Sequence, residues 1–285
     1  MQKGISTHLF LKEPLTIKHL KMGRASGFDK IELFALRPHF DYRNKLSTES
    51  IASWLVDHES VLISIHTPFC LDYQVSGNPE WLSISAPEKA IRQRALDEIR
   101  WALEFAELVP GPMAVVHMGI PEEPFNLRHM KATYHSLEAL LPFSRSLGVK
   151  IVLENIPNAL SIIATMRKFL EQSQLVDVGI CFDSGHSNLN GDPTDEIKEG
   201  GSLILTTHLH DNHGLRDEHL LPFEGNIDWI RVLEALMSNG YTGTYLLEVK
   251  ENGQPLEAIL MRAVAVFDRF QRCEEELLQL KTREG

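Results

Sequence analysis

The sequence has few cysteines and no long apolar run, and each shortage excludes a class of protein. Its 285 residues include three cysteines, Cys70, Cys181 and Cys273, an odd count without CxxC spacing. They predict neither a disulfide framework nor a cysteine zinc site. No apolar run approaches the ~18 residues that a membrane-spanning helix needs, and residues 1–4 begin no signal-peptide segment. We therefore expect a cytoplasmic protein that makes no membrane contact.

Positive charge is also scarce, since 28 Lys and Arg stand against 39 Asp and Glu and leave a net charge of −11. This balance argues against an extended nucleic-acid surface, although a local basic groove is compatible with an acidic total. No Gly-rich phosphate loop follows the first strand-like run, which disfavours an open doubly wound sheet. No linker rich in Pro, Gly or Ser interrupts the chain, so we expect one domain over residues 1–285.

What the sequence does contain is a regular alternation of short β-rich runs with longer amphipathic stretches. The runs that read as strands are Gly4–Phe10, Lys30–Ala35, Val61–His66, Met113–His117, Lys150–Glu154, Asp177–Asp183, Leu203–His210 and Thr244–Val249. Helical patterns between them include Glu88–Leu108, Leu127–Leu147, Ser161–Glu171, Trp229–Asn239 and Leu256–Leu280. This α/β pattern predicts a single (β/α)8 TIM barrel, which typically needs about 250 residues. A homo-oligomer is compatible with the sequence, which does not define the oligomeric state.

Polar side chains fall at the ends of successive predicted strands, where barrel enzymes place their active sites. The third to sixth predicted strands end at His66, His117, Glu154 and Asp183, and the seventh and eighth carry His208 and Glu248 close to their ends. The following loops add His186, Asp217 and His219, and the last two would point the same way if that segment were locally extended. His210, Asp211 and His213 belong to the same run, and we rank them lower, as residues behind the ligands or in the loop.

Taken singly, each residue has a plainer interpretation, because a lone strand-end His is more often a satisfied core residue and a lone Glu is commonly a helix cap. Together, four carboxylates that converge on one pocket could not all stay ionised without cations. These four are Glu154, Asp183, Asp217 and Glu248. Lys250 and Arg216 are the only obvious basic residues in these loops, and we expect Arg216 to contact substrate. A divalent metal is the natural counter-ion, and His with carboxylate suits Zn, Mn, Fe or Co.

The number of candidate ligands leaves the number of ions open, between one and three. One ion takes about four to six ligands, so nine candidates could hold two or three ions. Alternatively, Glu154, Asp183, His208 and Glu248 hold one ion, and the remaining histidines His66, His117 and His186 bind substrate.

With these residues in view, the sequence resembles the xylose isomerase-like TIM-barrel superfamily. This group contains sugar and sugar-phosphate isomerases and epimerases, inosose dehydratase-type enzymes and the endonuclease IV family of abasic-site repair enzymes. The resemblance rests on HTPF at His66, LENIP around Glu154, CFDSGHSNLNGDP from Cys181, HLHDNHGLRDEHLLPFEGNIDW from His208, and LLEV ending at Val249. For a single ion it implies ligation by residues matching Glu154, Asp183, His208 and Glu248. The endonuclease IV branch implies a trinuclear zinc cluster on all nine positions.

Some positions depart from the endonuclease IV pattern and favour the isomerase and epimerase group. Phe69 stands where endonuclease IV proteins usually carry Tyr, and His117-Met118-Gly119 replaces a His-Pro-Gly run. The resemblance therefore implies an enzyme acting on a small sugar or sugar phosphate, in which Glu154 and Glu248 transfer a carbon-bound proton through an enediolate. The alternatives are a phosphodiesterase of the endonuclease IV kind and a lyase of the inosose dehydratase kind.

Overall fold

Eight parallel strands form the centre of the protein. The computed structural model describes residues 1–71, 73 and 79–284, with the side chains of 281–284 not described. In ring order the strands are β10 (Thr244–Leu247), β1 (Gln2–Ser6), β2 (Lys30–Phe34), β3 (Val61–His66), β6 (Met113–His117), β7 (Lys150–Glu154), β8 (Gly179–Asp183) and β9 (Ile204–His208). The first and last strands of the chain lie side by side, because Gln2 pairs with Thr244 and Ile5 with Leu247. The predicted α/β barrel is confirmed.

Between β9 and β10, at the last seam of the ring, the strands are joined by fewer backbone bonds. Leu209 and Leu247 form a parallel bridge, and the Leu209 amide donates to the Leu246 carbonyl at 2.8 Å. The Thr207 hydroxyl adds a hydrogen bond of 3.2 Å to the Thr244 carbonyl. These contacts close the ring and bring Glu248, the residue after β10, beside the end of β9.

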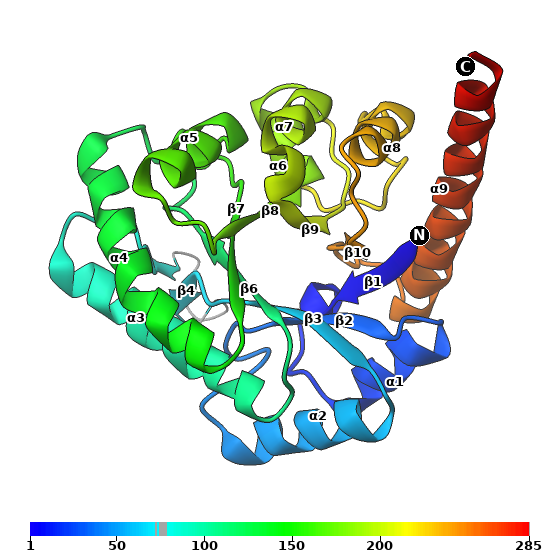
Figure 1. The fold of residues 1–285 in the computed structure, drawn as a ribbon. Helices are drawn as coiled ribbons and strands as arrows, with labels where there is room; N and C mark the ends of the chain where they lie inside the picture. The colour runs from blue at the N-terminus through cyan, green and yellow to red at the C-terminus, as the bar shows by residue number, and fades with distance from the viewer. Residues whose placement is uncertain (72, 74–78, 285) are drawn as a thin grey trace.

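Helices surround the strands (Figure 1). They are α1 (Ile17–Ala25), α2 (Lys45–Asp57), α3 (Lys89–Leu103), α4 (Leu127–Ser146), α5 (Ile163–Ser173), α6 (Ser184–Asn190), α7 (Pro193–Gly200), α8 (Trp229–Ser238) and α9 (Leu256–Glu284). A short antiparallel hairpin of β4 (Cys70–Leu71) and β5 (Glu80–Trp81) follows β3. None of the helices in the described ranges is long and apolar enough to cross a membrane.

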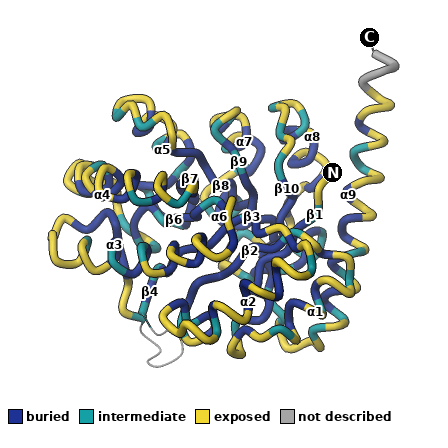
Figure 2. Tube along the Cα trace, turned by 60° about the horizontal axis from the view of Figure 1, so that its bottom comes forward, coloured by how far each residue is buried: buried dark blue, intermediate teal, exposed yellow. Residues whose placement is uncertain are grey.

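Apolar side chains from strands and helices form the core, and Figure 2 shows burial concentrated along the strands and the inner helix faces. The amphipathic spacing of α8 illustrates why: Trp229, Val232, Leu233 and Leu236 are buried, whereas Ile230 on the opposite face is exposed. Trp229 begins α8 and packs against the core with 1% of its surface exposed.

Several predicted boundaries were wrong, most clearly at the N-terminus. The expected strand Gly4–Phe10 ends at Ser6, and Thr7–Phe10 form a 3-10 helix whose first turn is capped by the Ser6 hydroxyl. Leu9 and Phe10 belong to that helix and are buried in the core. An apolar run that resembles a strand in the sequence can therefore fill the core from a helical turn. The turn places His8 at the mouth of the barrel, which a continued strand would not have done.

Candidate functional site

The predicted strand-end residues lie together at one end of the barrel. His66, His117, Glu154, Asp183 and His208 are the last residues of their strands. The register aligns two pairs of them, since His117 pairs with Glu154 and Asp183 with His208 across neighbouring strands. Between these pairs the register is offset by two residues, because His66 pairs with Val115 and Glu154 with Cys181. The structure thus brings this part of the predicted set to the same end of the barrel.

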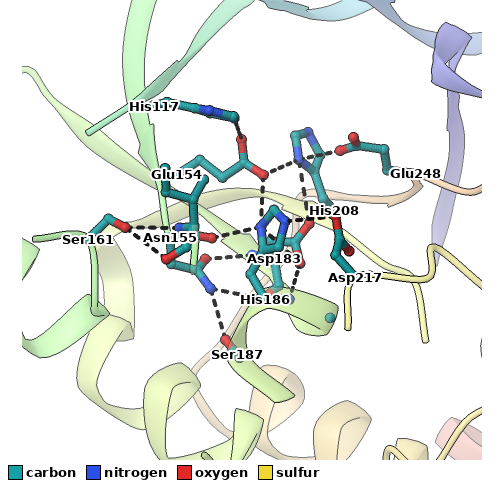
Figure 3. A network of polar contacts seen from close by, with 12 residues as sticks. His117, Glu154, Asn155, Ser161, Asp183, His186, Ser187, His208, Asp217 and Glu248 are labelled. Atoms are coloured by element: carbon teal, nitrogen blue, oxygen red, sulfur yellow. Dashed lines mark hydrogen bonds and ion pairs between the residues drawn. The ribbon is translucent and has the colours of Figure 1, made fainter. Parts of the chain in front are cut away.

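A first ligand set consists of Glu154, Asp183, His208 and Glu248, which offer one donor atom each within 4.8 Å of one another. His208 lies at its centre (Figure 3). Its Nδ1 atom stands 2.6 Å from Glu248 Oε2, 3.0 Å from Glu154 Oε1 and 3.9 Å from Asp183 Oδ2. A single imidazole nitrogen can donate only one hydrogen bond, so three converging carboxylates exceed what one proton can satisfy. One imidazole and three carboxylates fit a divalent cation such as Zn²⁺ or Mn²⁺.

Glu154 also faces two further histidines through its other oxygen. Oε2 lies 3.2 Å from His66 Nε2 and 3.1 Å from His117 Nε2. Because Oε1 faces His208 and Oε2 faces this pair, the Glu154 carboxylate has the orientation of a bridging ligand between two cation positions.

A second ligand set surrounds Asp217 and contains His186, His210 and His219, again with donor atoms within 4.8 Å of one another. Asp217 Oδ2 lies 2.8 Å from His219 Nε2 and 3.6 Å from His186 Nε2, and Oδ1 lies 3.9 Å from His210 Nε2. Three imidazoles and one carboxylate match the donor chemistry of zinc. The residues present therefore fit more than one divalent ion.

Asp217 and His219 meet for a different reason from the one predicted. Their segment is not extended, since His219 has a left-handed backbone with φ of +49°. Its Nδ1 contacts the Glu248 carbonyl at 2.9 Å, and this contact turns Nε2 towards Asp217. The pairing was predicted, but the extended backbone proposed for it was wrong.

The electrostatics of the two sets depend on the contacts between imidazoles and carboxylates. Burial alone would raise the pKa of Glu154, but the imidazoles of His208 and His117 hold it well below its ordinary value. Burial alone would lower the pKa of His186, but Asp183 and Asp217 raise it well above that value. Within the described ranges, the ion pairs seen at the carboxylates of both sets are all to histidines. The histidines are therefore the groups that face these carboxylates and that would share them with divalent ions.

The site opens into a cavity of about 240 Å³. One side is aromatic, with Phe34, Phe69 and Trp81, and Phe69 stacks on His117 with ring centres 5.0 Å apart. The polar side includes Lys250 and members of both ligand sets. Its volume lies below the ~300–1,000 Å³ of sites for drug-sized ligands, so it suits a small substrate.

Arg216 does not join the other predicted residues. Its side chain is 81% exposed, pairs with Glu218 at 3.1 Å and does not line this cavity in the described part of the chain. Lys250, the other basic residue noted in these loops, does line it. The structure thus favours Lys250 over Arg216 as the cation nearest a bound substrate.

His210 and Glu32 are site residues that the sequence interpretation ranked low or missed. His210 is fully buried, with Nε2 3.0 Å from Asp183 Oδ1, and its ring stacks on His219 at 4.0 Å. The sequence feature that could have identified His210 is its position two residues after His208, because side chains two residues apart in an extended segment point to the same side. The lower rank of Asp211 agrees with its structural contacts, because it accepts hydrogen bonds from the Phe223 amide and the Trp229 indole.

Known proteins share this sequence pattern and this architecture. The family described as "Xylose isomerase-like TIM barrel" matches residues 20–270. An uncharacterised protein of Methanocaldococcus jannaschii is 32% identical over 88% of this chain and 84% of its own length. The probable endonuclease 4 of Natranaerobius thermophilus is 23% identical over 89% of this chain and 94% of its own length.

Solved structures give the same fold. A D-tagatose 3-epimerase-like protein superimposes with a TM-score of 0.79 at 24% identity, over 98% of this chain and 100% of that chain. An L-ribulose 3-epimerase gives a TM-score of 0.78 at 17% identity, over 98% of this chain and 97% of that chain. At these identities the likeness extends to the fold, whereas the family match covers the motifs and most of the sequence, so the chain belongs to the xylose isomerase-like TIM-barrel family.

Proposed function

We propose that the protein is a metal-dependent epimerase or isomerase of a small sugar or sugar phosphate. The observation that carries this proposal is the pair of buried carboxylates, Glu154 and Glu248, which both line the cavity and both contact His208 Nδ1. They come from strands three places apart in the ring, so they approach a substrate from different directions. Epimerisation at a carbon beside a carbonyl needs this arrangement, because a proton leaves one face and another returns to the opposite face.

The chain's own residues supply the proton transfers and the substrate contacts. One of Glu154 and Glu248, as the carboxylate, removes the carbon-bound proton, and the other, as the acid, returns a proton. His66, His117 and His186 line the cavity and are placed to orient substrate oxygens. A divalent ion held by the first ligand set would supply the positive charge that stabilises an enediolate. The aromatic wall keeps water away from the reacting carbon.

Solvent exchange of a carbon-bound hydrogen tests the proposal. Zinc- or manganese-loaded protein is incubated in deuterium oxide with a panel of ketoses and ketose phosphates, and NMR measures deuterium uptake. We expect uptake that Glu154→Gln and Glu248→Gln each abolish, with metal content measured in parallel because both residues are also ligands. Glu98→Gln is the matched control, since Glu98 is equally buried but bonds to Tyr42 and Arg43.

A metal-dependent phosphodiesterase of the endonuclease 4 kind is the second candidate, and the second ligand set favours it. Clustered ions bridged by a carboxylate stabilise both attacking and leaving oxygens in such hydrolases, without removal of a carbon-bound proton. Cleavage of abasic-site DNA, run beside the exchange assay, separates the two. Metal-dependent strand cleavage with no deuterium uptake from any sugar would refute the epimerase proposal. A lyase would share the exchange but also release water from the substrate.

A further inference from the structure

A buried glutamate lies behind the first ligand set, on the far side of His208. Glu32 belongs to β2 and is 0% exposed. Its Oε2 atom lies 2.9 Å from His208 Nε2 and accepts a hydrogen bond of 2.6 Å from the Ser64 hydroxyl. Its Oε1 atom is buried and has no hydrogen-bond partner among the residues that the structure describes. A carboxylate in this setting is costly to bury, so the charges around it must offset that cost.

Carboxylates lie beside both ring nitrogens of His208. Nδ1 faces Glu154 and Glu248, where a cation fits, and Nε2 faces Glu32 at 2.9 Å. The buried thiol of Cys181 also lies within hydrogen-bonding reach of the ring. A carboxylate accepts hydrogen bonds and cannot donate one. Once a cation neutralises Glu154 and Glu248, Glu32 is the remaining acceptor and favours the tautomer that carries its proton on Nε2, which leaves the Nδ1 lone pair for the cation.

We propose that Glu32 is a positioning residue that fixes the tautomer and orientation of His208 and thereby sets the metal affinity of the first ligand set. Hydrogen bonds from a ligating histidine to a carboxylate orient the ring and raise its basicity, and loss of such a partner typically weakens metal binding by about 10–100-fold. The negative charge of Glu32 acts in the same direction, because it attracts a divalent ion more strongly than the single proton that would compete for Nδ1.

The inference rests on the proposed metal-dependent function, and Glu32→Gln tests it. The side-chain amide keeps the size of Glu32 but removes its charge, and its NH2 group can donate to Nε2 and so favour the opposite tautomer. Zinc affinity is measured by competition with a chromophoric chelator, in the full chain and in an Asp217→Ala/His219→Ala background that isolates the first set. We expect binding about 10–100-fold weaker in Glu32→Gln and unchanged in the matched variant Glu98→Gln.

A spectroscopic readout separates positioning from loss of structure. Long-range ¹H–¹⁵N spectra of the zinc-loaded protein, with His208 assigned through His208→Ala, report which ring nitrogen carries the proton. We expect a protonated Nε2 in the unaltered protein and loss of that signature in Glu32→Gln. If Glu32→Gln does not fold, Ser64→Ala removes the hydroxyl that holds the carboxylate, and we expect it to weaken zinc binding by a smaller factor.

The outcomes distinguish the two proposals. Absence of zinc binding in the unaltered protein would overturn the metal-dependent function and this inference together. Zinc binding that is unaffected by Glu32→Gln, or by Ser64→Ala where that variant is used, would overturn this inference alone. A protonated Nδ1 on His208 in the zinc-loaded protein would do the same.

Discussion

A single methyl group at Gly185, in α6, should displace His210 from the second ligand set. A Cβ at this position would lie 1.9 Å from Cε1 and 2.3 Å from Nδ1 of His210. Because non-bonded carbon atoms rest about 3.5–4.0 Å apart, the ring would have to move by roughly 1.5–2 Å. His210 is fully buried and contacts Asp183 at 3.0 Å, so this movement breaks a hydrogen bond to a carboxylate.

The expected cost of Gly185→Ala follows from three contributions. Overpacking of a dense core costs about 1–3 kcal/mol, and loss of a hydrogen bond to a charged group costs about 1.5–3 kcal/mol. Alanine recovers at most about 1 kcal/mol through its higher helix propensity. We therefore expect the free energy of unfolding to fall by about 2–5 kcal/mol in Gly185→Ala.

Urea denaturation of the metal-free protein measures this change, with Gly23→Ala as the matched control. Gly23 also lies in a helix, but in the described part of the chain no heavy atom other than the helix's own backbone and Gly23's chain neighbours stands within 4 Å of its added Cβ. We expect Gly23→Ala to be neutral or slightly stabilising. In a Gly185→Ala/His210→Ala double variant the clash is gone, so the two costs should not add. Unchanged stability in Gly185→Ala, or additive costs in the double variant, would refute the packing argument.

Three further predictions concern the metal sites and the acid sensitivity of the fold. Asp183→Ala should lose at least one equivalent of zinc by elemental analysis, and Asp183→Asn should lose it while keeping the cap on the His186 amide; full occupancy in both would contradict the ligand assignment. An Asp217→Ala/His219→Ala variant should bind fewer zinc ions than the unaltered protein, and an unchanged stoichiometry would demote both residues to other roles. Burial lowers the pKa of His39 to about 4 from 6.5, so the unfolded state takes up this proton first and stability is lost as pH falls from about 6.5 towards 4. The contribution of His39 to this loss should reach about 3 kcal/mol, so denaturation measured across that range should show a loss that is smaller by that amount in His39→Gln.

The ends of the strands could be predicted from the sequence, and with them most of the site. His66, His117, Glu154 and Asp183 each end a predicted strand, and parallel strands deliver their last residues to one end of a barrel. The prediction needed only the position of each strand end, which a polar residue after a β-rich run marks directly. Errors at the starts of the strands did not affect the positions of these side chains. For example, the strand predicted from Asp177 begins at Gly179 but still ends at Asp183.

Residues within strands or in irregular loops could not be placed in the same way. Glu32 stands in the middle of the run KIELF, and only the cost of a charged residue among buried neighbours marks it as unusual. Arg216 was expected at the substrate because it and Lys250 were the only obvious basic residues in these loops. The backbone turns in this loop direct Asp217 inward and leave Arg216 in solvent, and no periodicity in the sequence encodes that turn.

The two candidate functions share Glu154, so a variant of this residue cannot separate them. Glu154 contacts both His208 and His117, and its loss would disturb the first ligand set in either case. Asp217 is more informative, because it belongs to the second set alone and its ion pairs are to His186, His210 and His219 rather than to the proposed catalytic residues. An epimerase that needs one ion should keep its hydrogen exchange in Asp217→Ala, whereas a hydrolase that needs clustered ions should lose cleavage. Variants of the second ligand set, rather than of the first, therefore distinguish the two candidate reactions.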